Sequence, residues 1–193
     1  MKALILSDLF FELSLIKDSF SFLENKFNCK YDYFPGENDF NSDLIVAWGS
    51  GCLKIFENIN FINSVSIVLI SPYLDFDRFF LWFKTCENYE KEYFKRSGVS
   101  NKNYYRQIVD LKEIKNKKVF LNKGTIVKNL NIFIGGRDKI INPEDSLKLD
   151  FFFRNTSIHY LEDLGFVPFF EDYNLFRGIF EEYILNEYFR TVN

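Results

Sequence analysis

Hydrophobic residues in this chain gather in short unbroken runs that polar residues separate. Such runs are typical of strands covered on both faces of a sheet, and they occur at residues 2–6, 44–48, 64–71 and 131–136. KYDYF at 30–34 alternates between polar and apolar residues, which predicts another strand, and the turn signal Pro35-Gly36 follows it. SIHYLED at 157–163 is predicted to be the last strand.

Helical spacing of apolar residues follows several of these predicted strands. Ser7 and Asp8, directly after 2–6, have side chains suited to cap a helix. The apolar stripe of that helix comprises Leu13, Ile16, Phe20, Leu23 and Phe27. Asn142 and Pro143 have the residue types favoured at the N-cap and first position of another helix. A closing helix is predicted at Phe176, Ile179, Phe180 and Tyr183. Strands that alternate with helices predict an α/β domain with a mostly parallel sheet and helices on both faces.

Residues 74–117 break this alternation. The segment is aromatic and charged with a helical pattern, and we expect a helical cap insertion that lies across one end of the sheet. The length of 193 residues is typical of one domain with a single large core. We therefore expect a single domain over 1–193.

Composition and charge exclude several classes of function. The formal net charge of −3, without a dense basic patch, argues against nucleic-acid binding, because phosphate recognition needs concentrated positive charge. Cys29, Cys52 and Cys86 are widely spaced and include no CxxC pair, so we expect no metal, no disulfide framework and no cofactor. Asp8 and Glu12 interrupt the apolar N-terminal stretch, and no apolar window reaches the roughly 18 residues of a membrane span. These features favour a cytoplasmic protein without a membrane partner.

Residues 44–53, LIVAWGSGCL, lead from an apolar strand through a turn of small residues into a predicted short helix. This order resembles the nucleophile elbow of α/β-hydrolases, whose usual pattern is G-x-S-x-G. IFIGGRDKIINPEDSL resembles the strand and loop that deliver the acidic triad member of that family. SIHYLEDLGFVPFF resembles its last strand and the loop that usually reads G-H-x-P-F. The likeness spans most of the chain and implies a reduced α/β-hydrolase topology.

Within that superfamily, the chain is most similar to small esterases that cleave pimeloyl-carrier-protein methyl ester in biotin synthesis. Their elbow often reads G-W-S-x-G, and Trp48 keeps the tryptophan of that pattern. The resemblance implies an acyl carrier protein or a small acyl ester as partner or ligand.

The resemblance also implies a triad of nucleophile, acid and histidine at three turns. Asp138 takes the acidic position. When AWGSG is aligned with G-W-S-x-G, Gly49 takes the nucleophile position and Ser50 follows it. If Ser50 is aligned with the nucleophile instead, Trp48 stands where a small residue is usual. Phe166 occupies the histidine position in GFVPF and cannot accept a proton.

His159 is the only histidine of the chain and precedes Phe166, near the start of the last predicted strand. Catalytic loops follow the C-terminal ends of strands, so we expect His159 toward the other end of the sheet, in a structural or surface role. An oxyanion donor is expected from the loop after the first strand, where the amides of Asp8 or Leu9 could serve. Asp8, Leu9 and Trp48 are therefore the candidate ligand-pocket residues.

Three hypotheses for the function stay open. The first is an α/β-hydrolase homologue of the biotin-pathway esterase type that has impaired or no ester hydrolysis and binds an acyl ligand or partner. The second is a divergent esterase or thioesterase in which Ser50 attacks, with Asp138 and a base such as Asp8. The third is an unrelated small-molecule-binding module with a phosphate at the helix N-terminus at 49–52. Cys52, in that first turn, is a second candidate nucleophile or a small packed residue.

Overall fold

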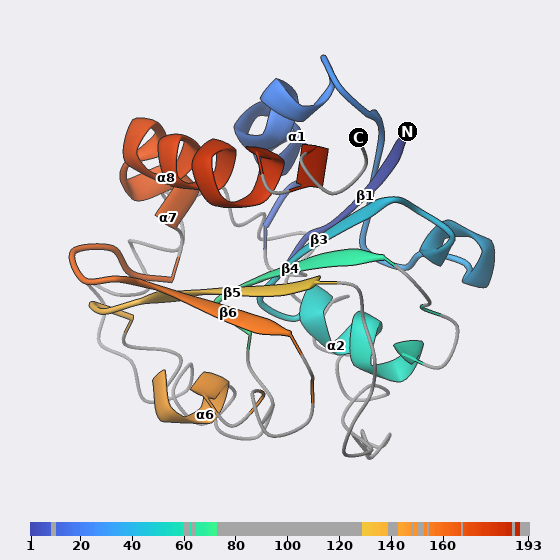
Figure 1. Ribbon diagram of the computed structural model, residues 1–193. Helices are drawn as coiled ribbons and strands as arrows, with labels where there is room; N and C mark the ends of the chain where they lie inside the picture. Colours follow the sequence, from blue (N-terminus) through green and yellow to red (C-terminus); the bar gives the residue numbers. More distant parts are fainter. Residues whose placement is uncertain are drawn as a thin grey trace.

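The computed structural model describes residues 1–8, 11–59, 62, 65–72, 129–138, 143–147, 149, 153, 155–166, 168–186 and 188–189. Within these residues, six strands form one sheet in the order β2-β1-β3-β4-β5-β6 (Figure 1), and all neighbouring strands are parallel. The strands are β1 (Lys2–Leu6), β2 (Asn28–Asp32), β3 (Leu44–Trp48), β4 (Ser66–Ile70), β5 (Asn129–Gly135) and β6 (Thr156–Leu161). The predicted α/β class with a parallel sheet is confirmed.

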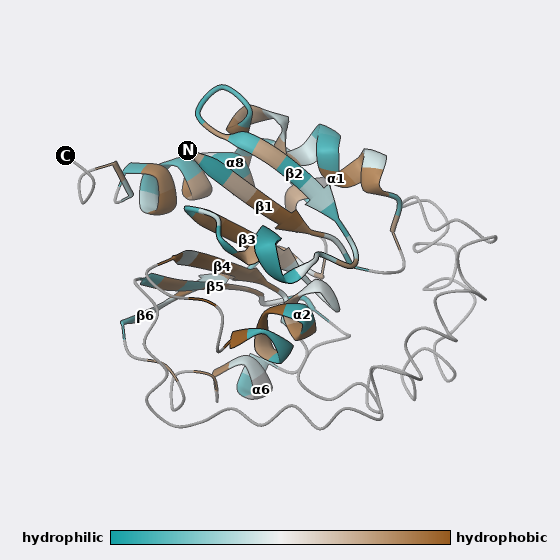
Figure 2. Ribbon diagram, turned by 90° about the vertical axis from the view of Figure 1, so that its right-hand side faces the viewer, coloured by the Kyte–Doolittle hydropathy of each residue, from teal (hydrophilic) through white to brown (hydrophobic). Residues whose placement is uncertain are grey.

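Helices cover both faces of the sheet (Figures 1 and 2). One face carries α1 (Leu13–Phe20), α7 (Pro168–Glu171) and α8 (Tyr173–Phe180), and the other carries α2 (Gly51–Glu57) and α6 (Pro143–Leu147). The strands between these layers are mostly hydrophobic (Figure 2), and every residue of β3 and β4 is buried. A strand that is covered on both faces needs apolar side chains at every position, which explains the unbroken apolar runs.

The helix after β1 begins later than the polar residues that follow the strand suggest. α1 starts at Leu13, and the side chain of Glu12 before it makes no cap hydrogen bond. The expected N-cap role of Ser7 and Asp8 is therefore wrong, and Asp8 binds elsewhere, as described below. The predicted apolar stripe is nevertheless the buried side of this segment, with Ile16, Phe20, Leu23 and Phe27 in the core. The chain continues beyond α1 through a 3-10 turn at Ser21–Leu23.

Other predicted bounds agree with the structure to different degrees. The strand predicted at 44–48 is β3, whereas the strand predicted at 30–34 is β2, which begins and ends earlier. Pro143 is the first residue of α6. Asn142 and the insertion predicted at 74–117 lie outside the described residues. After α8, a π-helical turn at Glu181–Leu185 continues the closing helix.

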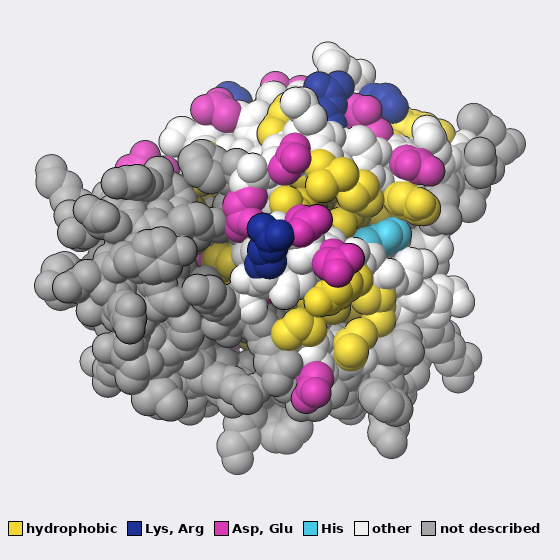
Figure 3. Space-filling view, turned by 90° about the vertical axis from the view of Figure 1, so that its left-hand side faces the viewer, with side chains coloured by type: hydrophobic (Ala, Val, Ile, Leu, Met, Phe, Trp, Pro, Cys, Tyr) yellow, Lys and Arg dark blue, Asp and Glu magenta, His cyan; other side chains and the backbone are white. Residues whose placement is uncertain are grey.

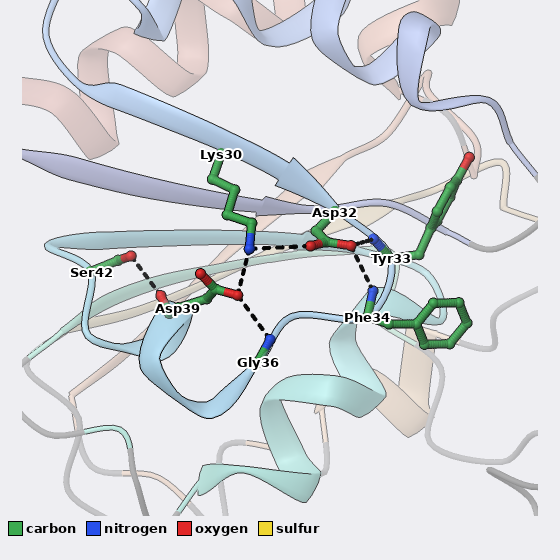
Figure 4. Close-up of polar contacts among 7 residues, drawn as sticks. All are labelled: Lys30, Asp32, Tyr33, Phe34, Gly36, Asp39 and Ser42. Carbon is green, nitrogen blue, oxygen red and sulfur yellow. Dashed lines mark hydrogen bonds and ion pairs between the residues drawn. The ribbon is translucent and has the colours of Figure 1, made fainter.

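Asp32 ends β2 by turning the chain. Its Oδ1 accepts hydrogen bonds from the backbone N–H groups of Tyr33 (2.7 Å) and Phe34 (3.0 Å), which favours a turn over a continued strand. The Lys30 ammonium lies 3.4 Å from Asp32 Oδ2 and 2.6 Å from Asp39 Oδ2 (Figure 4). These contacts join β2 to the 3-10 turn at Glu37–Phe40, from which the chain returns to the centre of the sheet.

The strand order reverses at β1. The chain goes from β1 outward to β2, and β3 then lies on the opposite side of β1. Leu6 pairs with Ala47, so the two strands end at the same edge of the sheet. In open α/β sheets, ligands bind beyond the carboxyl ends of the strands at such a reversal point. The turns after β1 and β3 are therefore the place to look for a site.

Candidate functional site

The turn after β3 contains one strained residue, Gly49, with a φ of +55°. Glycine adopts this left-handed conformation without the steric cost that a Cβ would add. Ser50, the next residue, has ordinary right-handed helical angles (φ −65°, ψ −24°) and precedes the first residue of α2. The backbone strain of this turn thus falls on Gly49 and not on Ser50.

The carboxylate of Asp8 fills the space beside Gly49. Asp8 is fully buried, and its Oδ2 accepts a hydrogen bond from the backbone N–H of Ser50 at 2.8 Å. A Cβ built on Gly49 would lie 2.2 Å from the same oxygen. The loop after β1 therefore supplies a hydrogen-bond acceptor to this turn, at the position where a side chain at residue 49 would stand.

Cys52 lies in the first turn of α2 but has the properties of a packed residue. Its side chain is fully buried, and its Sγ donates toward the carbonyl oxygen of Ala47 at 3.3 Å. Burial, together with the negative charge of Asp8, raises the pKa of the Cys52 thiol well above its ordinary value. The thiolate is the reactive form of cysteine, so this environment disfavours Cys52 as a nucleophile.

Phe166 lies against the turn after β3, as the resemblance implies for the histidine position. The indole Nε1–H of Trp48 donates a hydrogen bond to the carbonyl oxygen of Phe166 at 2.9 Å, and the two ring centroids are 5.4 Å apart. Phe11 and Phe169 pack on the same indole, with centroid distances of 4.2 and 4.9 Å. All four side chains are buried. Phe166 is thus part of a buried aromatic group around Trp48.

Asp138 follows β5 in a tight turn, where its N–H donates to the carbonyl oxygen of Gly135 at 3.2 Å. This turn lies directly beside the loop that leads to Phe166. The Arg137 N–H donates to the carbonyl oxygen of Leu164 at 2.9 Å, and a Cβ on Gly135 would lie 2.3 Å from the carbonyl oxygen of Gly165. The structure thus brings the turn at Asp138 and the loop before Phe166 together through their backbones.

His159 is level with Trp48 in the sheet, because the register links Trp48 to Ile70, Ile70 to Phe133, and Phe133 to His159. The expectation that His159 lies toward the opposite end of the sheet is therefore wrong. His159 is instead separated from Trp48 across the sheet, because the three strand spacings from β3 to β6 amount to about 14 Å. Its Nε2 lies 2.9 Å from Asn131 Oδ1, and its ring stacks on Phe133 at 4.7 Å. Figure 3 shows the histidine at the surface, beside hydrophobic side chains.

Two residues near the carboxyl edge have roles that the sequence pattern does not signal. Glu171 Oε2 accepts a hydrogen bond from the N–H of Gly165 at 2.6 Å and so holds the loop before Phe166. Ser71, directly after β4, is buried and has a left-handed φ of +44°. The Ser-Pro step at 71–72 indicates a strand end, but the sign of a backbone angle depends on contacts that only the fold provides. Leu9, a predicted pocket residue, lies outside the described residues.

No protein-family model matches this sequence, and no curated protein matches it by sequence. Solved structures do resemble it. A thermophilic esterase from Thermogutta terrifontis superimposes with a TM-score of 0.69 over 97% of this chain and 90% of that chain, at 11% identity. ClbQ from the colibactin NRPS/PKS pathway covers 98% and 97% of the two chains, with a TM-score of 0.59 and 13% identity. A variant of an epoxide hydrolase from Bacillus megaterium covers 93% and 92%, with a TM-score of 0.59 and 11% identity.

The chain has an α/β-hydrolase-like fold. In α/β-hydrolases the nucleophile occupies a strained strand-to-helix turn, and the N–H of the following residue donates to the oxyanion of the reaction. The strained residue here is Gly49, so the corresponding amide is that of Ser50. This geometry favours the alignment in which Trp48 and Gly49 match the tryptophan and the nucleophile of the elbow. It leaves Ser50 one residue beyond the strained position.

The described residues at this edge include no metal site. Within the ranges that the structure describes, no group of three or more His, Cys, Asp or Glu side chains is arranged to hold a metal ion. None of the described helices is long and apolar enough to cross a membrane.

Proposed function

We propose that this chain is a non-hydrolysing homologue of the α/β-hydrolase fold that binds an acyl group. One observation carries the proposal: the Asp8 carboxylate accepts the Ser50 amide hydrogen bond and occupies the space that a nucleophile side chain would need at Gly49. In a working elbow that amide stabilises the negative charge of a tetrahedral intermediate. A resident Asp8 side chain there disfavours ester hydrolysis by occupancy, because it takes both the amide and the space beside Gly49.

The other two triad positions support the same proposal. Gly49 has no hydroxyl, and Phe166 packs against Trp48 without any group that accepts a proton. The members of a triad act as a unit, and the loss of one removes most of the contribution of all. With nucleophile and base both replaced, the retained Asp138 has no imidazole at the family position to orient.

The ligand class follows from what surrounds the turn. Phe11, Trp48 and Phe166 form a continuous aromatic group beside it, and apolar side chains of this kind favour the hydrocarbon part of an acyl ester. The tryptophan of the elbow is the feature shared with the pimeloyl-carrier-protein methyl ester esterases. We therefore propose that the physiological ligand is an acyl ester or thioester, presented by acyl carrier protein.

The geometry supports the two other hypotheses less well. Ser50 as a nucleophile would have to act from a right-handed helical backbone, one residue after the left-handed position at Gly49. A phosphate at the start of α2 would have to replace the Asp8 carboxylate, which already accepts the Ser50 amide. The two groups would compete for the same amide, so the phosphate-binding hypothesis is disfavoured as well.

The test measures hydrolysis and binding separately. Wild type, Ser50→Ala and Asp8→Asn are assayed with p-nitrophenyl butyrate and with pimeloyl-carrier-protein methyl ester, and calorimetry follows the binding of the carrier-protein ester. Asp8→Asn keeps an oxygen that can accept the Ser50 amide but removes the charge. We expect binding by the wild type and no hydrolysis above the buffer rate in any of the three proteins.

Two outcomes would contradict the proposal. Turnover by the wild type that disappears in Ser50→Ala would identify Ser50 as a working nucleophile and the chain as a divergent esterase. Neither turnover nor binding of the acyl esters would remove acyl recognition from the proposal. Circular dichroism of each variant establishes that it is folded, so a loss of binding is not mistaken for unfolding.

A further inference from the structure

Ser71 has an unusual backbone conformation for its residue type. It follows the last residue of β4 with a φ of +44°, and the other described residue with positive φ that is not glycine is Asn155. Asparagine tolerates the left-handed region because its short amide side chain can bond to the local backbone. Serine does so less readily, so the conformation of Ser71 has to be imposed by its surroundings.

Backbone contacts on both sides impose it. The Ser71 N–H donates to the carbonyl oxygen of Phe133 in β5 at 2.9 Å, and the residue before it accepts from the N–H of Gly49 at 3.0 Å through the carbonyl oxygen of Ile70. On the other side, the Ser146 hydroxyl donates to the carbonyl oxygen of Pro72 at 3.2 Å. Strain that the surrounding structure over-determines in this way is concentrated at functional sites.

The hydroxyl of Ser71 is a second point of interest. Only 1% of the residue is exposed, and its Oγ has no hydrogen-bond partner within the described part of the chain. Buried polar groups in native structures are nearly always hydrogen-bonded, and an exception calls for an explanation such as backbone strain or a functional role. Ser66, at the other end of the same strand, is likewise buried with an Oγ that lacks a partner, and it offers a matched control.

We propose that the Ser71 hydroxyl donates a hydrogen bond to the carbonyl oxygen of the bound acyl group, an inference that rests on the acyl-binding function proposed above. A ligand carbonyl at this edge needs a donor, and Asp8 already occupies the Ser50 amide. Ser71 stands at the end of the neighbouring strand, because Trp48 pairs with Ile70. One strand spacing, about 4.8 Å, therefore separates it from the turn after β3.

The test compares two ligands that differ only in the carbonyl. The probes are the octanoyl thioester of N-acetylcysteamine and the corresponding octyl thioether, in which a methylene replaces the carbonyl, and calorimetry gives their affinities for the full chain. We expect Ser71→Ala to weaken thioester binding about tenfold, the usual effect of one lost hydrogen bond. Thioether binding should not change, because that ligand has no acceptor at this position.

Controls keep the result unambiguous. Ser71→Gly also removes the hydroxyl but accepts the left-handed φ, so it replaces Ser71→Ala if that variant folds poorly. Ser66→Ala removes the matched buried hydroxyl and should leave both affinities unchanged.

Each remaining outcome overturns a stated part of the inference. Ser71 variants that bind the thioester as tightly as the wild type would overturn the role of Ser71 and leave acyl binding intact. An equal loss for thioester and thioether would show that Ser71 shapes the pocket and does not contact the carbonyl. A wild type that binds neither probe would overturn acyl binding itself and this inference with it.

Discussion

The carboxylate of Asp8 and the backbone of Gly49 share one small volume at the carboxyl end of the sheet. Gly49 can approach the carboxylate because it has no Cβ, and its left-handed φ directs the chain into α2. Asp8 can be buried there because the Ser50 amide donates to it. The burial of Asp8 and the glycine at residue 49 therefore depend on each other.

This dependence predicts a non-additive pair of substitutions. Gly49→Ser should lower the free energy of unfolding by about 2–4 kcal/mol, since left-handed strain and the clash with Asp8 act together. In an Asp8→Ala background the clash is absent, and the same substitution should cost only about 1–2 kcal/mol. Urea unfolding of the four proteins measures the coupling. An equal cost in both backgrounds would show that Asp8 does not occupy the space beside residue 49.

At the scale of elements, the segments that follow β5 and β6 contact each other through their backbones. The turn after β5 and the loop after β6 touch at Gly135 and Gly165, where no side chain intervenes. Farther along, Asp172 caps α8 by accepting the N–H of Leu175 at 3.0 Å. Gly178, inside that helix, has nothing within 4 Å of where a Cβ would stand.

The two glycines should respond to alanine in opposite ways. Gly178→Ala should raise the free energy of unfolding by about 0.5–1 kcal/mol, because alanine has the higher helix propensity and the site has room. Gly135→Ala should lower it by about 3 kcal/mol or more, because the new methyl meets the carbonyl oxygen of Gly165 and backbone must move. Chemical denaturation of both variants tests this. A neutral Gly135→Ala would mean that the two loops are not in contact.

At the scale of the whole molecule, burial sets the titration of groups in β2 and directly after it. Burial, with a smaller contribution from the charge of Glu24, raises the pKa of the Cys29 thiol from 9.0 to about 11. Burial likewise raises the pKa of the Tyr33 hydroxyl to about 12. The folded chain therefore retains protons in alkaline solution that the unfolded chain releases.

This difference predicts a loss of stability in alkali. The contribution of Cys29 is complete below pH 9, its ordinary value, and is lost as the pH rises toward 11. Urea unfolding between about pH 8 and about pH 11 should show a falling free energy, and Cys29→Ala should make the decline less steep. Tyr33 is present in both proteins, so its contribution to the decline is the same in each. Identical slopes for the two proteins would contradict the assignment to Cys29.

The sequence alone determined the class of this fold, because a strand buried on both faces requires apolar side chains at every position. β3 has the predicted bounds for this reason, whereas β2 is displaced because Asp32 bonds to the backbone beyond it. The hydrogen bond between Trp48 and the carbonyl oxygen of Phe166 was not predicted, because the two residues are 118 positions apart.

Only the tertiary structure decided what occupies the site. Asp8 and Ser50 are 42 positions apart, so no local pattern shows that the carboxylate accepts the amide of the elbow instead of capping α1. The strain at Ser71 likewise depends on contacts with β5 and α6, which come much later in the sequence. The local pattern of apolar and polar side chains determines which segments form strands and helices, because each side chain has its own preference for burial. Hydrogen bonds across the sheet's carboxyl edge set the chemistry, because their partners meet only after the chain has folded.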